Sequence, residues 1–271
     1  MASIVITPPG RFSLPRVSEL WEAREVLYRF GARDVTLRYR QTLLGVVWVV
    51  LQPLLVALVF TLVFSKVAKL SVPHVPYLIF TFVGILAWNL FSGIVNRAQG
   101  SLISNRDLVS KVFFPRMLVP LATVYSCVID FLVATAFLGV LWIIDGINPG
   151  PQAFLLPVWA VLVILLASGV GLITAALTVR YRDVNYFVPY MLQFLLYASP
   201  IAYSISAVKN YNLFYDVNPL TWLLQEFQWS LALQPAPANW EFALSVVVPV
   251  LVFLGGAVLF EQMERGFADV I

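Results

Sequence analysis

Six apolar stretches, each about as long as a lipid bilayer is thick, constrain this chain more than any other feature. They contain no Lys or Arg, and Asp130 is the one acidic residue within them. The stretches cover residues 42–64, 75–95, 117–144, 153–179, 186–206 and 242–260. A helix needs roughly 20 apolar residues to cross about 30 Å of hydrocarbon. The sequence therefore predicts an all-α, polytopic membrane protein with six transmembrane helices.

Composition excludes other broad classes of protein. Of the 271 residues, 61% are hydrophobic and only 11% are charged, whereas about 25% is typical of a globular domain. A membrane β-barrel would show alternating segments of roughly ten residues rather than long continuous runs. No linker divides the chain, so we expect a cytoplasmic N-terminal segment, 1–41, followed by one membrane domain, 42–271.

The placement of basic residues predicts the orientation. With the N-terminus inside, fourteen of the 17 Lys and Arg residues fall in cytoplasmic segments and three in outer ones. Short cytoplasmic loops of membrane proteins carry this excess of positive charge. Both termini are therefore expected in the cytoplasm, and the basic run 33–42 marks the point at which the chain enters the membrane.

Two further segments predict helices that do not cross. In the N-terminal segment, apolar and charged residues recur at helical spacing, which favours an amphipathic helix in the inner interface. The apolar set is Val17, Leu20, Trp21, Leu27 and Tyr28, and the charged set is Glu19, Glu22, Glu25 and Arg29. This helix could be a simple surface anchor or have a mechanical role. Residues 203–237 are too polar to cross and predict short re-entrant helices on the outer side, broken near Pro219.

The sequence offers little that could perform catalysis or hold a metal. His74 and Cys127 are the single His and Cys, and we expect no catalytic residue, no metal site and no cofactor in this chain. Asp130 has no basic partner within any apolar stretch, so pairing with Ser, Tyr or Asn is favoured over proton coupling. With no phosphate-binding loop, energy for transport must come from a partner. The short amphipathic segment 101–111 is a candidate docking surface.

Several segments, in this order, resemble one family. The run 34–48 with Leu51-Gln52-Pro53 resembles the opening signature of polysaccharide-exporting ABC-transporter permeases, which include O-antigen and teichoic-acid exporters and, distantly, capsule exporters. Further similar segments are 108–116, 180–184, 199–201, 218–220 and 260–271. Together they extend over nearly the whole chain, and their joint order is more specific than any one of them.

The resemblance implies a homodimeric permease in a prokaryotic cytoplasmic membrane. Two copies of a separate ATPase would bind ATP and Mg²⁺, so this chain would be a transport subunit and not an enzyme. The substrate would be a lipid-linked polysaccharide, on an undecaprenyl pyrophosphate carrier, and no nucleic acid is expected. The coupling helix that meets the ATPase would include Asn105, Arg106, Asp107, Leu108, Val109 and Lys111.

Aromatic residues suit a conduit for sugar, because their faces can stack on sugar rings while few fixed charges hold the polymer back. The candidates are Tyr190, Phe194, Tyr197, Trp48, Trp88 and Tyr125. The alternative is that Trp and Tyr mark the membrane interfaces. The spacing of Tyr190, Phe194 and Tyr197 places them on one helical face in mid-span, where an interfacial belt explains them poorly.

Other residues predict headgroup contacts and helix breaks. Arg38, Arg40, Arg180 and Arg182 are expected at the inner membrane level, where they could serve topology, attract anionic lipid or bind a pyrophosphate headgroup. Breaks or kinks that suit gating are expected at Gln52, Pro53, Ser199, Pro200 and Pro219. Gly169, Gly171, Ala175 and Ala176 predict close helix packing.

Two rival functions stay open on the sequence. An ABC exporter of small drugs or lipids would share the six-span layout. A channel or secondary transporter that works without ATP would belong to another class and would need no nucleotide-binding partner. Association with an ATPase would favour an ABC exporter, of polysaccharide or of small drugs and lipids, over a channel or secondary transporter.

Overall fold

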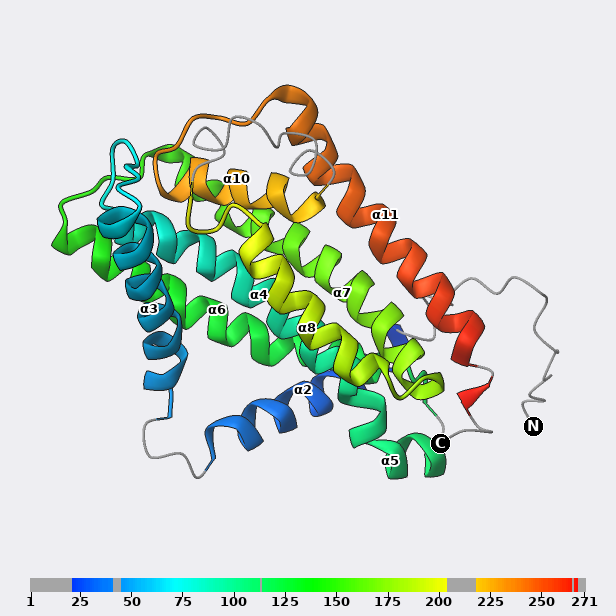
Figure 1. Ribbon diagram of the computed structural model, residues 1–271. Coiled ribbons are helices and arrows are strands. Elements are labelled where there is room, and N and C mark those ends of the chain that lie inside the picture. The colour runs from blue at the N-terminus through cyan, green and yellow to red at the C-terminus, as the bar shows by residue number, and fades with distance from the viewer. Residues whose placement is uncertain (1–20, 41–44, 113, 204–217, 265, 268–271) are drawn as a thin grey trace.

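The computed structural model describes residues 21–40, 45–112, 114–203, 218–264, 266 and 267, and all regular elements in these ranges are helices (Figure 1). They are α2 (Arg24–Tyr39), α3 (Val47–Phe60), α4 (Tyr77–Ser104), α5 (Arg106–Lys111), α6 (Leu118–Ile144), α7 (Leu156–Arg180), α8 (Val184–Ala198), α10 (Pro219–Leu231) and α11 (Asn239–Glu264). A π-helical turn, Thr61–Val67, extends α3, and a 3-10 turn, Pro151–Leu155, precedes α7.

Five helical stretches of the described chain are long and apolar enough to cross a membrane. They are Val47–Val67, Tyr77–Ser104, Leu118–Ile144, Pro151–Arg180 and Asn239–Glu264. These correspond to five of the six predicted spans. The remaining one, 186–206, contains α8, whose 15 residues extend for only about 22 Å. The last residues of that span lie outside the described ranges, so a sixth crossing stays a prediction.

The centre of the bundle is formed by α4 and α7, with α11 packed along α7. Gly169 of α7 faces the backbone of Val252 and lies opposite Gly256 of α11, and a Cβ at either glycine would collide with the other helix's backbone. Gly171 similarly faces the Ala98 side chain of α4. Small residues let membrane helices approach closely where dispersion rather than water expulsion holds them together. The predicted packing role of Gly169 and Gly171 is therefore confirmed.

Helix α10 covers one end of the bundle, at the opposite end from α2 and α5 (Figure 1). The Asn218 side chain accepts a hydrogen bond from the Leu220 backbone N–H at 3.1 Å, and Pro219 occupies the first turn. Proline fits there because its missing N–H would have no partner in the helix anyway. Helix α10 therefore begins at Pro219, and a helix that is broken just before this residue stays a prediction. Residues 204–217, the other part of the predicted re-entrant region, lie outside the described ranges.

The other two proline positions also differ from each other. Pro53 lies inside α3, buried and with helix on both sides, as expected of a membrane helix that tolerates proline. By contrast, α8 ends at Ala198, and Ser199 is extended because the residue before a proline avoids the helical region. The chain is thus broken at Ser199 and Pro200, one of the two outcomes expected there, and α8 ends instead of continuing through a kink.

Helix α2 runs further along the chain than the amphipathic pattern suggests. It includes the basic run from Arg33 to Tyr39, and it packs on α6 with Gly31 against the ring of Tyr125. Phe30 also contacts Phe114, with 5.6 Å between ring centroids. The predicted helix residues Val17, Glu19 and Leu20 lie outside the described ranges. The basic run is therefore part of a helix docked on the bundle.

Candidate functional site

The predicted aromatic row is present on α8 and faces away from the protein. Tyr190, Phe194 and Tyr197 are all well exposed, with Tyr190 71% accessible, and Tyr186 continues the row. On α3, Trp48 is also exposed, and Phe60 contacts Tyr197 at 6.3 Å between ring centroids. An uncovered aromatic surface this large usually marks a binding surface or a lipid-facing one. This aromatic surface extends from α8 to the exposed face of α3, because Phe60 and Tyr197 are in contact.

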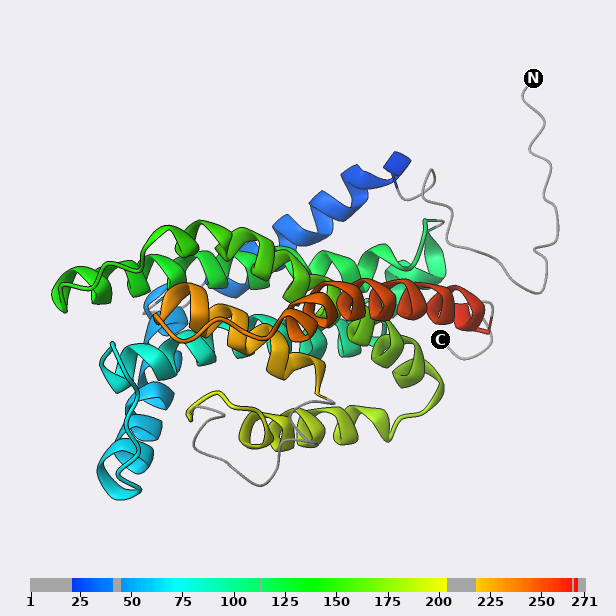
Figure 2. The same ribbon diagram turned by 90° about the horizontal axis from the view of Figure 1, so that it is seen from above.

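Two other predicted conduit residues do not belong to this surface. Trp88 is only 6% exposed and packs in the core against Phe91 of its own helix, α4. Tyr125 lies against Gly31 and Tyr28 of α2. Since α2 and α8 lie on opposite sides of the bundle, Tyr125 cannot join the α8 row within one protomer (Figure 2). Neither residue therefore belongs to the exposed α8 surface, and their assignment to a conduit stays a prediction, because aromatic identity alone does not reveal which side of a helix is covered.

The four predicted headgroup arginines have different environments. Arg38 forms an ion pair with Asp130, and Arg180 lies over the ring of Tyr181 at 5.6 Å. Arg40 and Arg182 are exposed. The end of α2 and the turn between α7 and α8 lie at the same end of the bundle (Figure 1), but no hydrogen bond or ion pair joins the two groups in the described chain.

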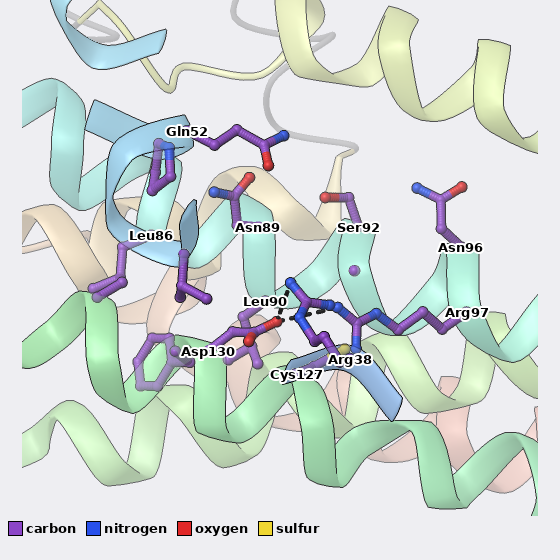
Figure 3. Close-up of a pocket in the computed structure, with 15 residues that line it drawn as sticks. Arg38, Gln52, Leu86, Asn89, Leu90, Ser92, Asn96, Arg97, Cys127 and Asp130 are labelled. Carbon is purple, nitrogen blue, oxygen red and sulfur yellow. Dashed lines mark hydrogen bonds and ion pairs between the residues drawn. The ribbon is translucent and has the colours of Figure 1, made fainter. Parts of the chain in front are cut away.

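Asp130 pairs with two arginines from outside the apolar stretches, whereas the sequence favoured pairing with Ser, Tyr or Asn. Arg38 Nη2 lies 2.7 Å and Arg97 Nη2 lies 3.1 Å from its Oδ2 atom (Figure 3). The Tyr39 hydroxyl donates to Oδ1 at 2.5 Å. Arg97 also donates to the hydroxyl of Ser126. The pairing with Tyr that the sequence favoured is real, but it is one contact among three.

Arg97 reaches Asp130 because α4 continues beyond the apolar stretch. The apolar stretch stops at Val95, yet the helix continues to Ser104 and brings Arg97 against α6. A carboxylate at membrane depth is costly unless it is paired, so this cluster explains how Asp130 is accommodated. Partial burial and the neighbouring carboxylate raise the pKa of Tyr39 to about 12, so this residue remains a hydrogen-bond donor near neutral pH.

The predicted coupling segment forms a helical turn and a short helix at the end of the bundle. Asn105 ends α4 and precedes α5, and its side-chain oxygen accepts a hydrogen bond from Arg33 of α2 at 2.5 Å. Leu102 and Val109 are buried inside the protomer, whereas Ile103 and Leu108 are exposed. Arg106, Asp107 and Lys111 are exposed too, and Lys111 lies 3.8 Å from Asp107. Only part of the segment is thus free to meet a partner.

Comparison with known proteins adds the family. The chain is 28% identical over 258 residues to an O-antigen export system permease protein RfbA of Myxococcus xanthus, which is 94% of this chain and 98% of the relative. It is 24% identical to an RfbA of Klebsiella pneumoniae over 88% of this chain and 92% of the relative. It is 24% identical to the polysialic acid transport protein KpsM of Escherichia coli over 71% and 76% of the two chains. The family model described as ABC-2 type transporter matches residues 26–231, and the chain therefore belongs to that family of membrane permeases.

Proposed function

We propose that this chain is the permease of an ATP-driven exporter that moves a lipid-linked polysaccharide across a prokaryotic cytoplasmic membrane. The observation that carries this proposal is the exposed aromatic row of α8, Tyr190, Phe194 and Tyr197. Aromatic side chains offer rigid, apolar faces with a polar tip, which suits a polymer whose sugar rings also have apolar faces. The names of the similar proteins support O-antigen or a related cell-surface glycan as the cargo.

The conduit forms between two copies of the chain. The face of α3 is exposed in the protomer at Leu55, Val59 and Leu62, and it is joined to α8 by the contact between Phe60 and Tyr197. A second copy that covers part of this surface would enclose the aromatic rows of both protomers. The working unit is a homodimer with two copies of an ATPase, which binds ATP and Mg²⁺, and this chain itself is a transport subunit.

The end of the bundle that carries α5 faces the cytoplasm, with both chain termini on that side. Ile103 and Leu108 provide exposed apolar contacts for the ATPase, while Arg40 and Arg182 provide positive charge at the membrane surface for the carrier headgroup. Helix α8 contributes most of a sixth crossing, the one predicted over residues 186–206. Helix α10, at the opposite end of the bundle, forms part of the outer gate.

The test is a matched pair of exposed residues at opposite ends of the bundle. In Leu108→Asp, a charge replaces an apolar contact on the ATPase-facing end, whereas Ile144→Asp makes the same change at the far end of α6. We expect Leu108→Asp to reduce copurification with the ATPase and glycan export by about tenfold, the order of one lost interface anchor. Ile144→Asp should leave ATPase association intact.

Three outcomes would count against the proposal. Transport by the permease without any ATPase would favour a channel or secondary transporter. ATP-dependent transport of a small drug or free lipid, with no glycan moved, would favour the other kind of ABC exporter. Equal effects of Leu108→Asp and Ile144→Asp on ATPase binding would contradict docking at α5.

A further inference from the structure

The ion cluster at Asp130 lies at the junction of two hollows in the protein. The first, with a volume of about 240 Å³, lies between α3, α4 and α6 and is lined by Arg38, Arg97 and Asp130 (Figure 3). The second, about 670 Å³ and more open, lies between α2, α4 and α6 and extends to Arg33 and Asn105. Arg38, Asn96 and Arg97 line both. The hollows therefore meet at the arginine pair.

The first hollow is lined by polar side chains, and the amides of Gln52, Asn89 and Asn96 are exposed in the protomer. Asn89, Ser92 and Asn96 follow one another at intervals of three and four residues, so they lie on one face of α4, and Gln52 of α3 faces the same space (Figure 3). Within the described chain, none of the amide side chains of Gln52, Asn89 and Asn96 has a hydrogen-bond partner in the protein. Polar side chains in a membrane span are costly and generally mark the path of a polar ligand.

The charges at the junction favour an anion. Two guanidinium groups share a single oxygen of Asp130, so the cluster keeps one positive charge in excess and most of the donors on both arginines remain available. The planar fork of Arg matches phosphate oxygens in pairs, as it matches carboxylates. Asp130 therefore occupies the position that the oxygens of a phosphate group would take between the two arginines.

We propose that the first hollow binds the phosphate-bearing, hydroxyl-rich headgroup of a lipid. Arg38 and Arg97 hold the phosphate, and the amide side chains on α4 and α3 bind the hydroxyls. The volume of this hollow is below the roughly 300 Å³ of the smallest typical ligand pockets, which suits one headgroup rather than a sugar chain. Asp130 is the internal competitor that pairs with the arginines when no headgroup is bound. The headgroup reaches the site through the second, more open hollow, which extends to Arg33 and Asn105.

Two lipids carry this chemistry. One is an anionic phospholipid such as phosphatidylglycerol, and the other is the pyrophosphate carrier of the glycan. The second source rests on the proposed function, whereas the first does not. The experiment therefore uses the permease–ATPase complex in nanodiscs of phosphatidylcholine alone or with added phosphatidylglycerol, and it measures binding of farnesyl pyrophosphate as the probe.

Substitutions distinguish a binding site from a structural latch. Arg97→Gln should weaken probe binding by about tenfold or more, the order expected when a charge-assisted hydrogen bond is lost. Asp130→Asn should strengthen it, by about threefold, because the competing carboxylate is removed while a hydrogen-bonding group of the same shape remains. Asn89→Leu leaves the ion cluster intact and keeps the side-chain size similar. Because farnesyl pyrophosphate carries no sugar or glycerol hydroxyls, this substitution should leave probe affinity within about twofold while it weakens competition by phosphatidylglycerol. Arg29→Gln, the same charge change on an exposed part of α2, should change affinity less than twofold.

The outcomes separate the alternatives. If Asp130→Asn weakens binding as much as Arg97→Gln does, or if Arg29→Gln has the effect of Arg97→Gln, the headgroup site is wrong. Competition by phosphatidylglycerol identifies a phospholipid site, and binding that phosphatidylglycerol leaves unchanged identifies the carrier. If the probe fails to bind while glycan export by the same complex continues, this inference fails and the proposed function stands.

Discussion

Helices α3 and α4 are both strongly apolar, yet they occupy opposite environments. In α4, 78% of the most apolar window is buried inside the protomer, whereas in the span that contains α3 the value is 11%, although that span has the higher mean hydropathy, 2.5 against 2.0. In a bilayer the lipid is as apolar as a leucine side chain, so hydrophobicity does not select the helix that lies in the core. The size of the side chains and the presence of polar groups, rather than hydropathy, therefore decide which of these helices is buried.

The residues of the two helices agree with this. Helix α4 carries Gly84, which lies against the backbone of Ile201, as well as the buried Thr81 and Gln99. The Gln99 amide donates to the Val184 carbonyl at 3.0 Å and so ties α4 to the start of α8. The exposed face of α3 consists of larger aliphatic residues such as Leu55 and Leu62. Small and polar residues thus mark the inner helix, and bulky ones mark the outer face.

The largest expected effect comes from replacing a buried aromatic residue, Trp88 of α4, by alanine, in contrast to an exposed one, Tyr190 of α8. Trp88→Ala should lower the free energy of unfolding by about 3 kcal/mol, because it leaves a cavity inside the protomer. Tyr190→Ala should change it by less than about 0.5 kcal/mol, because its ring is exposed, while glycan export falls. Thermal unfolding of the purified protein in detergent, together with an export assay, measures both. Equal destabilisation by the two substitutions would contradict the division into buried and exposed aromatics.

An intermediate effect is expected where two helices touch through glycine. Gly169→Ala places a Cβ against the backbone of α11, and overpacking of this kind costs about 1–3 kcal/mol. Gly139→Ala on α6 is the matched control, since no atom lies within 4 Å of its added Cβ. We expect the control to be neutral or stabilising, because Ala favours helix over Gly. A Gly169 variant as stable as the Gly139 variant would show that α7 and α11 pack less closely than the structure has them.

The smallest effect concerns Glu226, a fully buried residue of α10, outside the five spans. Burial raises the pKa of its carboxyl to about 7. The hydrogen bond that Ser245 donates at 3.5 Å partly offsets this rise, and the nearby negative charge of Glu241 adds to it. Because the folded-state pKa lies above the ordinary value of 4.5, the unfolded chain releases its proton first, and stability falls as the pH rises from about 4.5 through about 7. Glu226→Gln should therefore unfold a few degrees higher than the original protein at pH 8 and at the same temperature at pH 4. Parallel curves of the two proteins at both pH values would contradict a buried, ionisable Glu226.

Much of the fold follows from the sequence because a membrane imposes a length on any apolar helix. Five of the predicted spans coincide with long helices, and a short helix follows Asn105 as the coupling segment predicts. The site was less predictable. Trp88 and Tyr190 are both aromatic residues in apolar helices, and only packing distinguishes a core residue from one on an open surface. Arg97 was assigned to a loop because hydropathy reports where apolar residues stop, not where the helix does.

The sequence by itself determined the class of the protein, its helical segments and, through the order of its motifs, its family, because local composition and chain length are enough to fix these in a bilayer. Only the tertiary structure decided which helices are covered and which polar groups meet. Asp130, Arg38 and Arg97 come from three different helices, far apart along the chain. No local pattern encodes such a contact, because it depends on how far α4 continues and on where α2 docks against α6.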